Sequence, residues 1–281
     1  MRLLVGFDGS DGGRDALELS RLLASETEGS VVVATVLFGG PLPLEFARLE
    51  KHEAGDAEPL FEEARAVLSG IEVETRPYGG GSPAAILTQL AEDEEEGFDA
   101  IVVGSPHRGP VGRVLIGSVA RNLLNGGPRE TFVAPRGYAE ERHDPLRTIA
   151  VAYDGSPEAK QALRSAEALA KHSNATLRLI TVVSIPVFVP GAVGYTPAPV
   201  PVDPEKLQGE AVATIDPKLA VEERRLDGSP GSLLVQNCEE DVDLLVLGSR
   251  GYGPLARVLL GSVSRRAAQD APCPVLVVPR P

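Results

Sequence analysis

The chain has 281 residues, enough for one large or two ordinary domains, and 43% of them are hydrophobic, which can supply a core for each. Its formal net charge of −13 repels polyanions, so nucleic acid is not an expected partner. No apolar run is long enough to span a membrane, and the N-terminus reaches Asp8 too early for a signal peptide; we expect a cytoplasmic protein without a membrane partner.

The first half of the chain alternates short apolar runs with helical patterns. The runs predict strands at about Leu3–Phe7, Ser30–Leu37, Glu72–Arg76, Ala100–Gly104 and Thr131–Ala134. The segments between them place apolar residues at helical spacing, as in ALELSRLLA. Strands that are apolar on both faces and separated by helices indicate parallel β-α-β units with right-handed crossovers.

The second half repeats this order. The opening RLLVGFDGS (Arg2–Ser10) recurs as TIAVAYDGS (Thr148–Ser156), and the ending TFVAPR recurs as VLVVPR. Ser156 is expected to cap a helix that has Pro157 at its first position. The sequence therefore predicts two copies of one unit, each a doubly wound five-stranded α/β domain.

The period of the repeat, near 145 residues, is typical of a duplicated domain, because each copy is large enough to bury its own core. We predict domains at 1–138 and 146–281, joined by the polar linker GYAEERHDP. Ligands of such sheets bind at the carboxyl ends of the strands, where the winding direction reverses.

A glycine-rich stretch stands at the corresponding place of each copy, GSPHRGPVGRVLIGS at Gly104–Ser118 and GSRGYGPLARVLLGS at Gly248–Ser262. The second stretch begins with the last two residues of the buried run DLLVLGS. Its final Gly-Ser is expected to begin a helix. Unpaired N–H groups and the helix dipole make Gly261, Ser262 and Val263 a natural phosphate cradle. Asp154, at the end of the copy's first strand, would lie beside this cradle and could bind a ribose.

These motifs resemble the universal stress proteins (UspA-like), in their tandem form and of the ATP-binding type. The ATP-binding pattern of that family, G-x2-G-x9-G-[S/T], is matched by Gly248, Gly251, Gly261 and Ser262. The resemblance covers nearly the whole chain and implies an adenine nucleotide alpha hydrolase-like fold. It also implies that the two final strands pair across a pseudo-twofold axis inside one chain, which would hide two sheet edges.

By the same resemblance the ligand is ATP, which Mg²⁺ could accompany. Our hypothesis is that an unidentified protein partner reads the nucleotide state; further association into a homodimer stays open. Adenine would lie at the end of the second strand, the ribose at the first, and the phosphates at the helix-opening Gly-Ser. The residues implied in the second copy are Ala152, Asp154, Val182, Gly248, Gly251, Gly261, Ser262 and Val263. Those implied in the first are Asp8, Val36, Gly104, Gly117, Ser118 and Val119.

The first copy departs from the pattern, because His107 stands where Gly251 stands in the second. His107 could be a solvated loop residue or a ligand. Several other residues also have two interpretations. The aspartates of the first strands could simply cap the following helices. Arg113 and Arg257 could reach phosphate or lie on the surface, and EDEEEG (92–97) is expected to be a solvated helix end rather than a metal site.

Two further function classes compete with an ATP-binding regulatory protein. An adenylating pyrophosphatase would use S-G-G-x-D-S after its first strand, whereas this chain has DGGRDA at Asp11–Ala16. A scaffold protein with empty pockets is the other alternative. Because no base and metal-binding carboxylates stand at suitable spacing for hydrolysis, we predict no catalytic residues and no metal ligands. Cys238 and Cys273 lack a C-x-x-C motif and are predicted to be packing residues.

Overall fold

The computed structural model describes residues 1–37, 47–48, 57–106, 110–183, 203–239, 241–249 and 261–280. His107, Gly251 and Arg257 lie outside the described residues. The elements of the first copy are β1 (Arg2–Gly6), α1 (Asp11–Glu26), β2 (Ser30–Leu37), β3 (Ala47–Arg48), α2 (Glu58–Val67), β4 (Glu72–Gly79), α3 (Pro83–Glu92), β5 (Ala100–Gly104), α4 (Ser118–Leu124) and β6 (Glu130–Ala134). A short 3-10 turn (Tyr138–Glu140) follows in the linker.

The second copy repeats the series, as the sequence predicts. Its elements are β7 (Thr148–Ala152), α5 (Pro157–Ser173), β8 (Thr176–Val183), α6 (Pro204–Val212), β9 (Val221–Asp227), α7 (Pro230–Cys238), β10 (Leu244–Gly248), α8 (Ser262–Asp270) and β11 (Val275–Val278). The predicted start of α5 is confirmed, because Ser156 is its N-cap and the Ser156 hydroxyl accepts from Ala159 N at 3.2 Å.

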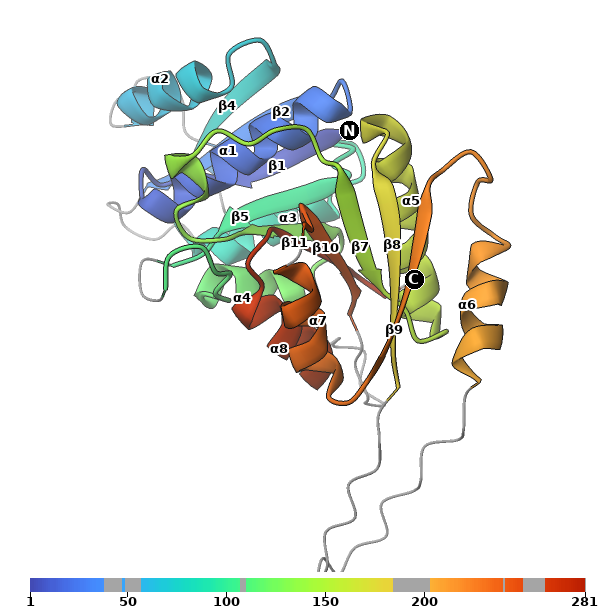
Figure 1. Cartoon of the computed structure of the whole chain (residues 1–281). Helices are drawn as coiled ribbons and strands as arrows, with labels where there is room; N and C mark the ends of the chain where they lie inside the picture. Colours follow the sequence, from blue (N-terminus) through green and yellow to red (C-terminus); the bar gives the residue numbers. More distant parts are fainter. Residues whose placement is uncertain are drawn as a thin grey trace, which may run out of the picture.

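The strands form one continuous sheet in the order β3-β4-β2-β1-β5-β6-β11-β10-β7-β8-β9 (Figure 1). Five strands of each copy run parallel, and the copies meet where β6 and β11 pair antiparallel. The ten predicted strands are therefore present, in two five-stranded halves. The two-residue strand β3 adds an antiparallel edge beside β4 that the sequence did not indicate.

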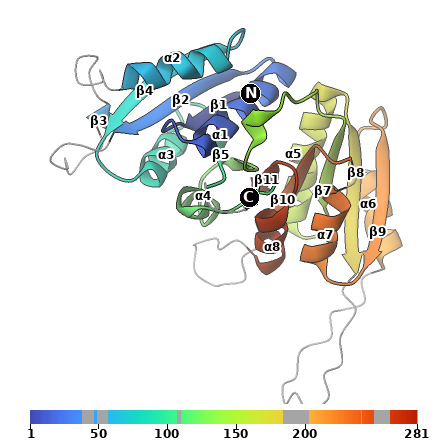
Figure 2. The ribbon, with the colours of Figure 1, turned by 60° about the vertical axis from the view of Figure 1, so that its left-hand side comes forward.

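Helices cover both faces of the sheet, and the two copies lie side by side about the β6–β11 seam (Figure 2). One core packs α1, α2, α5 and α6 against one face, and the other packs α3, α4, α7 and α8 against the opposite face. Both cores contain residues of both copies, because the apolar alternation of β6 and β11 continues each layer across the seam.

The seam is centred on Phe132 and Leu276, which are paired across it and fully buried. The flanking pairs are Thr131 with Val277 and Val133 with Val275. Each flanking pair is the image of the other under the internal repeat, so the pairing has twofold pseudo-symmetry. The predicted association of the last strands inside one chain is confirmed.

The linker is fastened to the first copy by a buried carboxylate. Asp15 of α1 is 1% exposed, and its two oxygens accept from Gly137 N at 3.0 Å and Ala139 N at 2.8 Å. Burial raises the pKa of Asp15, and the two backbone bonds oppose that shift. Asp15 therefore fixes the path of the chain as it leaves the first copy.

Two side-chain contacts differ from the sequence-based expectations or extend them. Within the run 92–97, Glu96 is not simply solvated: its carboxylate pairs with Arg76 at 2.5 Å and with Arg2 at 3.5 Å. The two cysteines are buried, as expected of packing residues, and their thiols interact with each other. Contact with Cys238, together with burial, raises the pKa of the Cys273 thiol.

Candidate functional site

The Asp-Gly-Ser turn after the first strand of each copy has the same geometry. Oδ1 of Asp8 accepts from Ser10 N, and Oδ1 of Asp154 accepts from Ser156 N, both at 3.0 Å. The helix caps are the serines, so the alternative that the aspartates cap these helices is wrong. Both carboxylates are exposed at the strand ends, on the strands that lie between the second and fourth strands of their copies.

Glycine is required at the centre of each turn. Gly9 has φ +76° and Gly155 has φ +78°, in the left-handed region that side chains disfavour. A Cβ at Gly9 would also lie 2.7 Å from Leu60 Cδ2, and one at Gly155 would lie 2.6 Å from Leu207 Cδ1. The turn and the helix packed against it are therefore preserved in both copies.

The first glycine of each motif is needed for packing. Its place in the sequence does not distinguish this role from ligand binding. A Cβ on Gly104 would lie 1.7 Å from the carbonyl oxygen of Gly12 in α1. A Cβ on Gly248 would lie 2.8 Å from the backbone of Glu158 in α5. Each glycine thus lets the helix after the first strand lie directly on the end of the fourth strand, which closes one wall of the site.

The last glycine of each motif begins a helix, as predicted. Gly117 is the N-cap of α4 and Gly261 is the N-cap of α8, and neither helix start receives a side-chain cap. In the second copy, Ser264 Oγ donates to Gly248 O at 2.8 Å and holds the first turn of α8 against the end of β10. Ser262 and Val263 are exposed at this start, where a helix leaves its first N–H groups without intrahelical partners.

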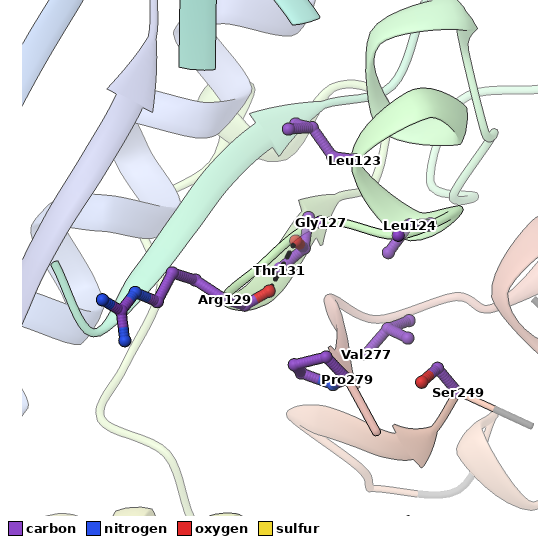
Figure 3. A pocket seen from close by; sticks show the side chains of 9 residues that line it. Leu123, Leu124, Gly127, Arg129, Thr131, Ser249, Val277 and Pro279 are labelled. Carbon is purple, nitrogen blue, oxygen red and sulfur yellow. Dashed lines mark hydrogen bonds between the residues drawn. The ribbon is translucent and has the colours of Figure 1, made fainter. Parts of the chain in front are cut away.

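A serine after the fourth strand also organises the loop, a role that sequence reasoning missed. Ser105 is 2% exposed; its hydroxyl donates to Ala134 O at 2.7 Å and accepts from Leu115 N at 2.9 Å. Its counterpart Ser249 is equally buried, and its hydroxyl has no hydrogen-bond partner within the described part of the chain. Ser249 lies with Val277 and Pro279 across a narrow cavity from Leu124 (Figure 3). The Gly-Ser pair at the end of the fourth strand in both copies was the sequence signal that could have indicated this role for Ser105 and Ser249.

The predicted adenine end of the site lies on β2 and β8. Val36 and Val182 are half-buried near the carboxyl ends of these strands, and Ala152 is half-buried at the end of the neighbouring β7. The preceding residues, Thr35 and Thr181, are 1% and 4% exposed, and neither hydroxyl has a partner among the described residues. Within the described residues, the same place in both copies therefore has a buried hydroxyl without a hydrogen-bond partner.

Arg113 lies at the surface, as one of its two interpretations expected, and there it contacts the second copy. Its guanidinium donates to Asp270 O at 2.9 Å and to Glu239 Oε1 at 2.6 Å, both in the second copy. The next residue, Val114, is fully buried and donates from its N–H to Ala271 O at 2.9 Å. The glycine loop of the first copy is therefore attached to α7 and α8 of the second, by contacts between residues more than a hundred positions apart.

The described residues also lack two kinds of feature. They contain no group of three or more His, Cys, Asp or Glu side chains that could hold a metal ion. None of the helices they form is both long and apolar enough to cross a membrane.

The fold and the two motifs define a class of protein. It consists of tandem, doubly wound α/β proteins with an Asp-Gly-Ser turn after the first strand and a Gly-Ser helix start after the fourth strand of each copy. Comparison with known families gives the particular family. The model of the universal stress protein family matches residues 1–135 and again 145–279. The chain belongs to this family and contains two of its domains.

Individual relatives agree with this assignment. A universal stress protein of Mycobacterium tuberculosis (strain H37Rv) is 28% identical over 299 residues, covering 99% of this chain and all of the relative. A universal stress protein of Thermus aquaticus is 34% identical over 149 residues, which is 47% of this chain and 98% of the relative. The crystal structure of a universal stress protein from Archaeoglobus fulgidus DSM 4304 shares the fold, with a TM-score of 0.73, 21% identity and coverage of 100% and 98%.

Proposed function

We propose that this protein binds ATP in the strand-end site of its second copy and that the bound state is read by a protein partner, with little or no turnover. The observation that carries the proposal is the complete glycine motif in the sequence, together with the places of Gly248 and Gly261 in the structure. Gly248 ends β10, Gly261 begins α8, and the exposed Asp154 follows β7, the strand that pairs with β10. The expected site would therefore have the packing of α5 against Gly248 as one wall and the start of α8 as its phosphate-binding end.

Each residue then has a defined task. The N–H groups of Gly261, Ser262 and Val263 and the Ser262 hydroxyl would bind phosphate oxygens. Asp154 would accept from the ribose hydroxyls, and the backbone of Ala152 and Val182 would line the adenine end. Asp8, Val36, Gly104, Gly117, Ser118 and Val119 would form the matching site of the first copy. When bound, Mg²⁺ would offset the charge of the phosphates, which this acidic chain otherwise repels.

The adenylating pyrophosphatase alternative is disfavoured by the roles that DGGRDA has in the structure. Asp15 is occupied with the linker amides Gly137 N and Ala139 N, and it is 1% exposed. A Cβ on Gly12 would lie 2.3 Å from Ser105 O, so Gly12 is needed for packing. These packing and linker-binding roles weigh against use of DGGRDA as a phosphate loop.

The two sites are expected to differ in ATP affinity, because His107 stands in the first copy at the place where Gly251 stands in the second. A histidine adds a side chain where the ligand must lie and disfavours a positive φ by about 1–2 kcal/mol. The second copy should therefore bind ATP roughly five to thirty times more tightly, since about 1.4 kcal/mol is tenfold. Calorimetric titration of His107→Gly and Gly251→His with ATP measures this difference.

Loss of the tight site in Gly251→His, with strengthening of the weak one in His107→Gly, is the expected result. Repeating the titration near pH 6, where an ordinary imidazole is mostly charged, separates the roles of His107. If His107→Gly abolishes ATP binding in the first copy, the histidine is a phosphate ligand and the steric argument is wrong.

A further inference from the structure

A second cavity lies away from the strand ends, between the two helices that begin at the Gly-Ser pairs. Figures 1 and 2 both show α4 and α8 side by side across the seam between the copies. The cavity between them has a volume of about 230 Å³ and is lined by Ile116, Arg121, Leu124, Asn125, Arg265 and Gln269. It belongs to neither copy alone.

The polar lining of this cavity is repeated across the seam. Arg121 is the third residue after Ser118, and Arg265 is the third residue after Ser262. Asn125 and Gln269 occupy matching places one turn further along α4 and α8, and both are carboxamides. The internal repeat therefore brings two guanidinium groups and two carboxamides to one cavity from opposite sides.

The charge of this cavity contrasts with that of the whole chain. The formal net charge is −13, yet the six lining residues include two cations and no carboxylate. A guanidinium group has five N–H donors, so Arg121 and Arg265 can each donate charge-assisted bonds to one end of an anion that has two charged ends. Guanidinium groups are suited to phosphate oxygens because their N–H groups form a planar fork.

We propose that the cavity between α4 and α8 binds a small phosphate-containing anion with two charged ends, which bridges Arg121 and Arg265 and joins the two copies. Pyrophosphate is the simplest ion of this class. Both arginines are exposed at the cavity, so the anion can enter from solvent. The site is separate from the glycine-loop cradles, and the inference does not depend on ATP binding.

Calorimetric titration of the full chain with inorganic pyrophosphate, without divalent cations and at low ionic strength, tests the proposal. We expect one pyrophosphate per chain at this site and at least a tenfold loss of affinity in Arg121→Gln and in Arg265→Gln. Arg164→Gln is the matched control, because Arg164 is an exposed arginine of α5 that bonds to Gln161. It should leave the affinity within a factor of two.

The Gly261→Leu variant distinguishes this cavity from the phosphate cradle of the second copy. If the cavity is the site, pyrophosphate binding persists in Gly261→Leu and fails in the two arginine variants. The proposal is overturned if wild-type protein does not bind pyrophosphate, if the arginine variants bind as wild type does, or if only Gly261→Leu loses binding. The pyrophosphate titrations do not test the nucleotide site. Titration of the same arginine variants with ATP tests that site separately.

Discussion

Replacing Phe132 with alanine is expected to lower the free energy of unfolding by about 3–5 kcal/mol, the range for removing a fully buried aromatic side chain. Phe132 is 0% exposed and lies opposite Leu276 at the centre of the β6–β11 seam. Its ring packs in the core layer that runs through both copies. The cavity left by alanine would therefore weaken each copy and their association together.

Urea unfolding followed by circular dichroism measures this effect. Val111→Ala is the control, because Val111 is 59% exposed and its truncation should change the free energy of unfolding by less than about 0.5 kcal/mol. A loss below about 1 kcal/mol for Phe132→Ala would mean that the seam is not a tightly packed core. Separation of the transition into two steps in the variant would show that the seam couples the copies.

Replacing Gly261 with leucine should weaken ATP binding to the second copy at least about tenfold, or ~1.4 kcal/mol. Gly261 begins α8 without a side-chain cap, so its backbone is the part of the helix start nearest an incoming phosphate. A leucine side chain would obstruct that approach and leave the helix dipole unchanged. Isothermal titration calorimetry with ATP gives the affinity directly.

Gly209→Leu is the matched control for this substitution. Gly209 is an exposed glycine of α6, and a Cβ built on it meets nothing within 4 Å. The control should bind ATP as the wild-type protein does. Unchanged affinity in a folded Gly261→Leu variant would place the phosphates elsewhere or leave the pocket without a ligand.

Most of the fold could be predicted from the sequence, because the signals are local and occur twice. The alternation of apolar runs and helical patterns located the ten main strands, and Ser156-Pro157 marked the start of α5. The strand β3 gave no signal, since a two-residue edge strand has too few positions to show a period. Its pairing with β4 is a tertiary contact.

The site was predicted less completely, because one residue type can serve packing and binding. The spacing of the glycines located Gly248 and Gly261, but it could not show that Gly248 lets α5 lie against β10. The partners of Arg113 could not be predicted either, since they lie at the C-terminal ends of α7 and α8 in the other copy. Such contacts follow from how the copies pack, which no local pattern encodes.

The same limit applies to Cys238 and Cys273, which were correctly expected to be packing residues without any sign that they touch. It applies to Asp15 as well, whose place in DGGRDA suggested a comparison with phosphate loops. The structure shows that Asp15 binds the linker amides instead.

The nucleotide that the protein retains tests the central claim most directly. Protein purified without added nucleotide would be denatured, and the released small molecules would be identified by ion-exchange chromatography and mass spectrometry. The account predicts ATP in the wild-type sample and its depletion in Gly261→Leu. Recovery of AMP and pyrophosphate would instead support the adenylating enzyme, and wild-type protein that neither retains ATP nor binds it in titration would contradict the account.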